Sequence, residues 1–327
     1  MLPTPDTSHV SFDRIYEPAE DSFLLLDTLS APSEKEFLRQ RFPRDEQTSL
    51  SSSPFVVEIG TGSGVVLSFV HAHAETIFGR ADIFTAGVDV NRYACEATQE
   101  TVRIAEEEQI SQNLSHGSYL GNVVGNLGTC LKPGMVDVMI FNPPYVPSPD
   151  VPVPELSGAG NEDGTLTYEG DSKLLALSYA GGVDGMEITD RLIDALPEVL
   201  NRERGCAYIL LCAQNKPEDV KERIRGFGDE WKAETVRFGA CHLMLPEINM
   251  TSVPQYRCDA VKKADVCIKA HGQNVPLLVP NVSQYNLPPS EFLSCRHYRY
   301  NEHRISPVTY STPILRNLFH RLGPDLL

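Results

Sequence analysis

Short apolar runs alternate along the chain with longer segments in which apolar residues recur at helical spacing. The apolar runs predict strands, and the periodic segments predict helices. The predicted helices are at 20–29, 65–78, 92–108 and 184–200. The predicted strands are at 55–59, 84–90, 136–141 and 207–213. This alternation predicts a mostly parallel central sheet with helices on both faces, an α/β fold of the Rossmann-like class.

Two polar segments lie between these elements. Residues 30–54 are rich in Ser and Pro, and we interpret them as a surface loop or a partly disordered insertion. Residues 147–171 carry several Pro and Gly among many polar residues, shortly after the strand that ends at Phe141. We expect this second segment to be a long flexible loop.

Charge is unevenly distributed along the chain. The 327 residues include 28 Lys and Arg and 44 Asp and Glu, a formal net charge of −16. Residues 239–327 hold 9 basic and 6 acidic residues, so residues 1–238 carry a net charge of −19. Nucleic acids and anionic membranes attract basic surfaces, and this acidity argues against both as partners. We therefore predict a domain at 1–238 and an atypical tail at 239–327, irregular or a small appended region.

The sequence also bears on the cellular compartment. No apolar run is long enough to span a membrane, and the first residues lack the basic and apolar stretches of a secretory signal. The 8 Cys residues are scattered without a CxxC pair, which is typical of reduced thiols. We expect a soluble protein of the cytoplasm or the nucleus.

A glycine-rich turn joins the strand at 55–59 to the next helix. It reads Gly60-Thr61-Gly62-Ser63-Gly64 and is preceded by Glu58. Such a turn lets the backbone approach a ligand closely, although a plain structural turn has the same composition. Asp89 ends the next strand, where a carboxylate can accept hydrogen bonds from a ribose diol or can cap a helix. Together these residues indicate a cofactor that contains a nucleoside.

The most specific motif is Asn142-Pro143-Pro144-Tyr145, at the carboxyl end of the strand at 136–141. Ligands bind at this edge of an open α/β sheet. The Asn142 side-chain oxygen and the Pro143 carbonyl can accept from one planar –NH2 group, on which the Tyr145 ring can stack. Two such acceptors orient the nitrogen lone pair toward an electrophile and stabilise the positive charge that develops on nitrogen. A plain proline-rich loop is the alternative.

Four segments together resemble a known family. They are residues 16–29 (YEPAEDSFLLLDTL), 58–66 (EIGTGSGVV), 87–91 (GVDVN) and 141–148 (FNPPYVPS). The set is similar to the HemK-type class I methyltransferases, which depend on S-adenosyl-L-methionine. More narrowly, it resembles the eukaryotic and archaeal branch that methylates the glutamine of the GGQ motif in class I peptide-chain release factors. The resemblance runs from about residue 16 to residue 238.

The resemblance implies roles for individual residues. Asp89 would bind the ribose of S-adenosyl-L-methionine. Asn142 would hold the substrate amide with Pro143 and Tyr145, and would also contact the cofactor. The remaining cofactor-binding residues would be Glu58, Gly60, Thr61, Gly62 and Gly64 around the methionine part, with Glu20 and Ser22 nearby in a segment folded over it.

One expected residue is missing from the chain. The family places an Asp after the third strand, where it accepts a hydrogen bond from the adenine amino group, and the region YLGNVVGNLGTCL has none. Asn126 is the first candidate for this position by its spacing to the NPPY motif, and Asn122 is the second. An amide oxygen can accept the same hydrogen bond.

The tail departs from the family pattern. Class I methyltransferases close their sheet with two antiparallel strands. Residues 229–238 fit the first, but nothing after Phe238 resembles the second. An appended domain, a lineage-specific tail, and an unnatural reading frame or splice product are the alternatives, of which the composition favours the last. We predict no metal site, because the spacings of the tail residues Cys258, Cys267, His271, Cys295 and His297 match no usual zinc ligand set.

The resemblance implies transfer of a methyl group to the side-chain amide nitrogen, N5, of a glutamine in a translation release factor. It also implies a heterodimer with a small zinc-binding activator subunit. Two alternatives stay open. The NPPY motif also suits the N6 amino group of adenine in DNA or RNA, and a chain without its adenine-binding Asp and closing strand could be a catalytically impaired binding protein.

Overall fold

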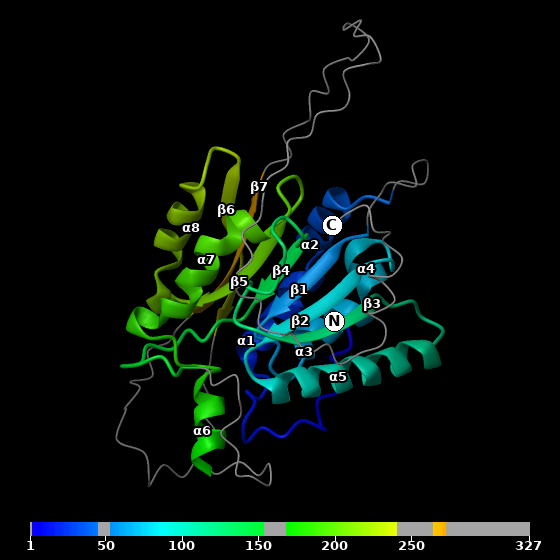
Figure 1. Cartoon of the computed structure of the whole chain (residues 1–327). Coiled ribbons are helices and arrows are strands. Elements are labelled where there is room, and N and C mark those ends of the chain that lie inside the picture. Colours follow the sequence, from blue (N-terminus) through cyan, green and yellow to red (C-terminus); the bar gives the residue numbers. More distant parts are fainter. Residues whose placement is uncertain (1, 45–52, 154–167, 241–263, 273–327) are drawn as a thin grey trace, which may run out of the picture. The chain divides into compact units, whose positions relative to one another are not determined.

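A seven-stranded sheet in the order β3-β2-β1-β4-β5-β7-β6 forms the centre of the fold (Figure 1). The computed structural model describes residues 2–44, 53–153, 168–240 and 264–272. Strands β1 to β5 pair in parallel, and β7 lies antiparallel between β5 and β6. The strands are β1 (Phe55–Ile59), β2 (Phe84–Asp89), β3 (Ser118–Val124), β4 (Val138–Phe141), β5 (Cys206–Cys212), β6 (Trp231–Ala240) and β7 (Ala264–Gly272).

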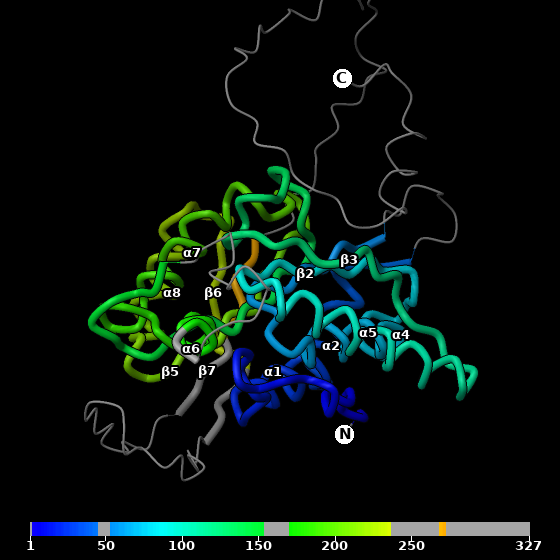
Figure 2. Tube along the Cα trace, turned by 60° about the horizontal axis from the view of Figure 1, so that its bottom comes forward, coloured from blue at the N-terminus to red at the C-terminus, as the bar shows by residue number. Residues whose placement is uncertain are grey.

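Helices cover both faces of this sheet (Figure 2). One layer holds α1 (Glu20–Ser30), α2 (Pro32–Arg41), α3 (Val65–Ala72) and α4 (Ala74–Phe78), and α5 (Arg92–Ser111) packs beside α3 against β2 and β3. The opposite layer holds α7 (Glu187–Val199) and α8 (Pro217–Arg225). The remaining elements are α6 (Tyr168–Ala176) and the short 3-10 helices η1 (Val183–Gly185) and η2 (Ala213–Asn215). The predicted Rossmann-like class I methyltransferase fold is therefore confirmed.

The central strands are buried on both faces, which explains their continuous apolar sequences. On β4, Val138 and Ile140 pack on the layer of α1 to α4, whereas Met139 and Phe141 pack on the layer of α7 and α8. A parallel sheet covered on both sides needs apolar residues at every position of such a strand.

None of the helices in the described part of the chain is both long and apolar enough to cross a bilayer.

Two predicted helices are each interrupted. The segment predicted at 65–78 forms α3 and α4, with His73 between them, and the segment predicted at 184–200 forms η1 and α7. The predicted loop at 147–171 ends in a helix, because α6 begins at Tyr168. Residues 154–167 of that predicted loop lie outside the described residues.

The prediction of a loop at 30–54 is wrong for residues 32–41, which form α2. Pro32 occupies the first turn, where its fixed φ suits a helix. Leu38 and the following Phe42 are almost completely buried in the core below α2. Few apolar residues anchor this helix, and its many polar residues concealed it in the sequence.

The prediction that no closing strand follows Phe238 is also wrong, because β7 closes the sheet. It pairs along the whole of β5, from Cys206 opposite His271 to Cys212 opposite Asp265. Ile268 belongs to the core under α7 and α8, whereas neighbouring Lys269 points to α2. The sheet thus extends beyond residue 238, and the other tail residues lie outside the described ones.

A buried ion pair joins α2 to β7. Lys269 Nζ donates to Glu34 Oε2 at 3.0 Å, and the Tyr208 hydroxyl of β5 donates to the same oxygen at 2.9 Å. The Lys269 side chain is 4% exposed and that of Glu34 5%. Lys269 Nζ also lies 3.8 Å from the centre of the Phe37 ring. The polar residues of α2 and β7 therefore satisfy one another inside the fold.

Replacing Lys269 by Met leaves the Glu34 carboxylate buried without its cation. Loss of one member of a buried ion pair costs about 3–5 kcal/mol, and we expect Lys269→Met to lower the free energy of unfolding by that amount in urea titrations. A second substitution, Glu34→Gln, removes the uncompensated charge and restores much of the loss. Lys232→Met, at an exposed position of β6, is the control. Equal stability of the two lysine variants would contradict the buried pair.

Candidate active site

The glycine turn places the start of α3 beside the end of β2. Gly60 N–H donates to the Val88 carbonyl at 2.7 Å. Gly64 has φ of +80°, and a Cβ there would lie 2.6 Å from Thr98 Cα, so glycine allows α3 to pack closely on α5. Gly62 has φ of +52°, and apart from its two neighbours in sequence no described residue has an atom within 4 Å of where its Cβ would be. The turn is thus tight on its α5 side and open at Gly62.

Two buried carboxylates hold this turn from below. Glu58 Oε2 accepts from the backbone N–H of Leu67 in the first turn of α3, at 2.8 Å. Asp89 Oδ2 accepts from Gly62 N–H at 3.0 Å, and Asp89 Oδ1 accepts from Asn91 N–H at 2.8 Å. Burial raises the pKa of both carboxyl groups, and their backbone hydrogen bonds oppose the increase. A cationic ligand at the turn would stabilise their ionised forms.

Three buried polar atoms near the carboxyl edge have no hydrogen-bond partner in the described part of the chain. They are Thr61 Oγ1, Asn122 Oδ1 and Asn142 Oδ1. Buried polar atoms in native proteins are nearly always paired, so each unpaired one needs an explanation. A bound ligand that donates hydrogen bonds at this edge explains all three.

The Asp21 carboxylate of α1 holds two residues of the NPPY motif. Its Oδ2 accepts from Asn142 Nδ2 at 3.1 Å and from the Tyr145 hydroxyl at 3.1 Å. Its Oδ1 accepts from the backbone N–H of Ser22 at 2.6 Å. Since a carboxylate only accepts, the –NH2 end of Asn142 must face Asp21. The Asn142 Oδ1 atom therefore faces away from Asp21, free to accept from a substrate.

The other side of the NPPY loop is fixed by η1 and η2. Asn215 Nδ2 donates to the Tyr145 carbonyl at 3.1 Å and to the Asp184 carbonyl at 3.0 Å. A Cβ at Gly181 would lie 2.2 Å from the Pro144 carbonyl oxygen, and one at Gly185 would lie 2.0 Å from that of Tyr145. The glycines at 181 and 185 therefore let this turn contact the backbone of the motif directly.

The other predicted site residues lie as follows. Ser22 is buried, and its hydroxyl donates to Asp21 Oδ1 at 3.2 Å, whereas Glu20 is the exposed first residue of α1. Pro143 is buried within the motif. Asn126 follows β3, where its Oδ1 accepts from Arg191 at 3.2 Å. Asn122 lies within β3, and its Nδ2 donates to the Cys95 carbonyl at 2.7 Å.

Asp21 was not among the predicted site residues, although a signal for it exists in the sequence. It shares one face of α1 with Leu24, Leu25 and Thr28, all of which are buried. A carboxylate on the apolar face of a helix must have a buried partner, because burial of an unpaired charge is costly. The periodicity of the helix therefore marks Asp21, but it does not reveal Asn142 as the partner.

Comparisons with known proteins show the family of the chain. No protein-family model matches the chain. It is 32% identical over 232 residues to methyltransferase HEMK2 of Mus musculus, covering 69% of this chain and 86% of that protein. It is 31% identical over 231 residues to the eRF1 methyltransferase catalytic subunit mtq2 of Schizosaccharomyces pombe, covering 70% of this chain and 87% of that protein. A release factor glutamine methyltransferase of Bacillus cereus is 25% identical over 171 residues, with 52% of this chain and 50% of that protein covered. The chain therefore belongs to the HEMK2 and mtq2 family of HemK-type class I methyltransferases.

Proposed function

We propose that this chain methylates the side-chain amide nitrogen of a glutamine in a class I peptide-chain release factor. The observation that carries the proposal is the buried Oδ1 of Asn142, which has no partner among the described residues. It faces away from Asp21, because the Nδ2 of Asn142 donates to Asp21. That oxygen matches the –NH2 group of a planar amide. Two relatives support this choice of substrate: the eRF1 methyltransferase catalytic subunit of Schizosaccharomyces pombe and the release factor glutamine methyltransferase of Bacillus cereus.

The residues of the glycine turn fit S-adenosyl-L-methionine as the methyl donor. The open side of Gly62 and the unpaired Thr61 hydroxyl can receive its methionine part, and the Asp89 carboxylate can accept from the ribose hydroxyls. Glu58 and Asp89 place two buried carboxyl groups beside the turn, whose ionised forms a cationic ligand favours. When bound, this cofactor supplies an electrophilic methyl group and carries positive charge on sulfur, which buried carboxylates favour.

Orientation and charge stabilisation carry the reaction in this proposal. An amide nitrogen is a weak nucleophile because its lone pair is delocalised into the carbonyl. Asn142 Oδ1 and the Pro143 carbonyl each accept one amide hydrogen, which directs the lone pair and stabilises the positive charge that develops on nitrogen. The Tyr145 ring packs against the amide plane. The proton lost from nitrogen passes to water, so no strong general base is needed.

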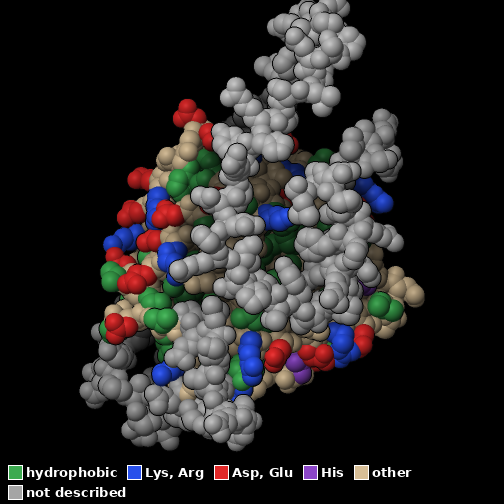
Figure 3. Space-filling view, viewed as in Figure 1, with side chains coloured by type: hydrophobic (Ala, Val, Ile, Leu, Met, Phe, Trp, Pro, Cys, Tyr) green, Lys and Arg blue, Asp and Glu red, His purple; other side chains and the backbone are tan. Residues whose placement is uncertain are grey.

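A protein substrate suits this chain better than a nucleic acid. Among the described residues on the face in Figure 3, acidic and basic side chains are mixed over α5 and over α7 and α8. Residues 1–238 carry a net charge of −19, which repels phosphate backbones and complements a basic protein surface. Adenine N6 methylation remains the second candidate, because the NPPY motif alone accommodates either nitrogen.

We propose the cytoplasm or the nucleus as the location.

We further propose that a small zinc-binding activator subunit pairs with the β3 edge. β3 is an edge strand of the sheet, and its residues Val123 and Val124 are 38% and 45% exposed. An edge strand offers unpaired backbone donors and acceptors to another chain, and exposed valines add apolar area. These features support an edge-to-edge heterodimer.

Replacing Asn142 by Ala tests the proposed reaction. We expect Asn142→Ala to lower kcat by about 10²–10³-fold, because the acceptor that orients the amide is lost. Transfer of a radiolabelled methyl group to a release-factor domain that carries the GGQ glutamine measures this rate. Gln112→Ala, which removes an exposed amide at the end of α5, should keep the wild-type rate. Label on DNA or RNA instead of the protein would contradict the proposed substrate.

The adenine assignment has its own test. An Asp at position 126 offers a charged acceptor, and we expect Asn126→Asp to bind S-adenosyl-L-methionine about 1 kcal/mol more tightly, roughly fivefold. Asn122→Asp should show no such gain in affinity, because this substitution removes the –NH2 group that donates to the Cys95 carbonyl. Isothermal titration calorimetry measures both. If only Asn122→Asp tightens binding, the adenine lies at position 122.

Replacing Val124 by Asp tests the activator surface. A charge on the exposed edge opposes the burial of this strand against a partner, so we expect Val124→Asp to abolish co-purification with the activator subunit while the cofactor still binds. Val183→Asp, at an exposed position of η1, should co-purify normally. Unchanged co-purification of Val124→Asp would place the activator elsewhere.

A further inference from the structure

Three metal-ligating side chains gather at the end of the molecule opposite the active site. They are His71 near the end of α3, Glu106 on α5, and His116 just before β3, with one ligand atom from each within 4.8 Å of the others. α3 runs back from the carboxyl edge of the sheet, so its last turn lies near the amino ends of β2 and β3. The cluster is therefore separate from the NPPY motif and from the glycine turn.

The distances in this cluster suit a metal ion. His71 Nε2 lies 3.0 Å from Glu106 Oε1. Two ligands at about 2.0–2.2 Å from a zinc ion in tetrahedral geometry are separated by a little over 3 Å. The His71 side chain is fully buried and that of Glu106 is 31% exposed, which gives an ion a path from solvent.

Both imidazoles are held through their other nitrogen. His116 Nδ1 lies 2.9 Å from the Gly117 carbonyl, and since a carbonyl only accepts, Nδ1 carries the hydrogen and Nε2 keeps a free lone pair. His71 Nδ1 lies 3.0 Å from the Thr85 hydroxyl of β2, which can accept its N–H. Histidines that bind metals nearly always donate their second N–H to a protein oxygen in this way.

The backbone brings the two histidines together. Gly117 follows His116, and its backbone N–H donates a hydrogen bond to the His71 carbonyl at 2.8 Å. This hydrogen bond holds His116 next to His71. A Cβ at Gly117 would lie 3.1 Å from His71 Nδ1, which favours glycine at this contact. The ring centres of His71 and His116 are 5.3 Å apart. The loop before β3 is thus built around the His71 side chain.

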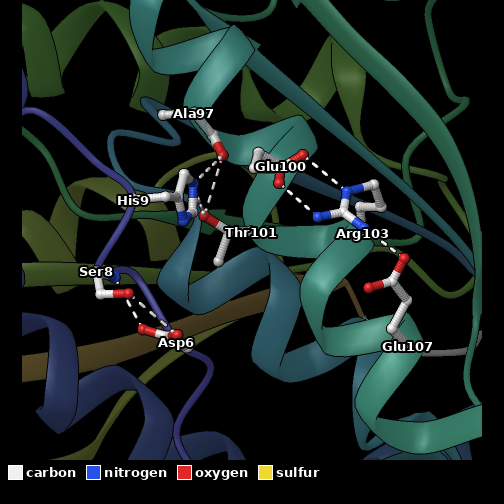
Figure 4. Close-up of polar contacts among 8 residues, drawn as sticks. All are labelled: Asp6, Ser8, His9, Ala97, Glu100, Thr101, Arg103 and Glu107. Carbon is white, nitrogen blue, oxygen red and sulfur yellow. Dashed lines mark hydrogen bonds and ion pairs between the residues drawn. The ribbon is translucent and has the colours of Figure 1, made fainter.

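The surrounding charges do not compete for this cluster. Arg103, the nearest cation along α5, pairs with Glu100 and Glu107 on the exposed side of that helix (Figure 4). Glu106, next to Glu107 in sequence, points instead to His71. The Glu106 carboxylate therefore faces the two imidazoles, whereas Arg103 is engaged by Glu100 and Glu107.

A polar group that could hold a metal-bound water lies beside the cluster. The Tyr119 ring packs edge-on against His71, with ring centres 6.3 Å apart. The Tyr119 hydroxyl is buried and lacks a hydrogen-bond partner among the described residues. A water on an ion at the cluster would give this hydroxyl a partner.

We propose that His71, Glu106 and His116 bind one divalent transition-metal ion, of the kind that prefers imidazole nitrogen with one carboxylate. Two imidazoles select zinc, cobalt, nickel or copper over magnesium and calcium, which prefer oxygen ligands. The ion lies between His71 Nε2 and Glu106 Oε1, which are 3.0 Å apart. It ties α3, α5 and the loop before β3 together, and so stabilises the edge of the sheet on which β3 lies.

Titration of the metal-free full-length protein with Co²⁺ tests the proposal, because four- or five-coordinate Co²⁺ absorbs visible light. We expect one equivalent to bind with d–d bands in the wild type. His116→Ala and Glu106→Gln should each bind at least about tenfold more weakly, as expected for loss of a ligand. The control is His9→Ala, which removes an exposed histidine that contacts α5 on another side (Figure 4). Its binding should equal the wild type.

Thermal unfolding separates binding from folding defects. Zinc should raise the Tm of the wild type and of His9→Ala, because an ion that binds only the native state stabilises it. It should leave the Tm of His116→Ala and Glu106→Gln nearly unchanged, whatever their Tm without metal. Equal Co²⁺ affinity in all four proteins, no binding at millimolar Co²⁺, or a thiolate-to-metal absorption band would each overturn the site, the last by placing the ion on cysteines.

Discussion

The hydrogen bonds of the Asp21 carboxylate fix the direction in which the NPPY motif acts. One oxygen of Asp21 accepts from both Asn142 and Tyr145. An asparagine amide can turn by 180° at little cost, and only its partners decide which end faces a substrate. A buried carboxylate accepts and never donates, so it forces the –NH2 end of Asn142 inward and leaves the oxygen for the substrate. Hydrogen bonds to charged groups contribute about 1.5–3 kcal/mol each, enough to hold one orientation.

The rest of the fold keeps this carboxylate in place. Leu24 and Leu25 of α1 are buried in the core shared with α3, which positions the start of α1 above the carboxyl edge of the sheet. On the opposite side, Asn215 ties the Tyr145 carbonyl to the turn before α7. The motif is thus fixed through its side chains by α1 and through its backbone by η1 and η2. Preorganisation of this kind lets a site act by orientation without a strong base.

The sequence predicted the fold and the motif well, because both depend on local patterns. Apolar runs identify strands buried on two faces, and the glycine turn and NPPY lie where such strands end. The failures share one cause, which is burial of polar residues in pairs across the chain. β7 has Lys269 at a buried position among its apolar residues, and the mostly polar α2 has Glu34 at another, so neither element shows the continuous apolar pattern of a buried element. The ion pair that buries them is a long-range contact that no local pattern contains, and the same holds for Asp21 and Asn142.

Asp21 acts in this site by orienting Asn142. Replacing it with Asn keeps the shape of the side chain but adds a donor, so Asn142 can adopt both amide orientations. The decisive measurement is the single-turnover rate of methyl transfer to the release-factor domain, at saturating cofactor and substrate, for Asp21→Asn against Asp27→Asn, the other aspartate of α1. We expect a rate about 10–100-fold lower for Asp21→Asn alone, since misplacement of an orienting group has effects of that order, with cofactor affinity unchanged in both variants. Equal rates for the two variants would contradict it.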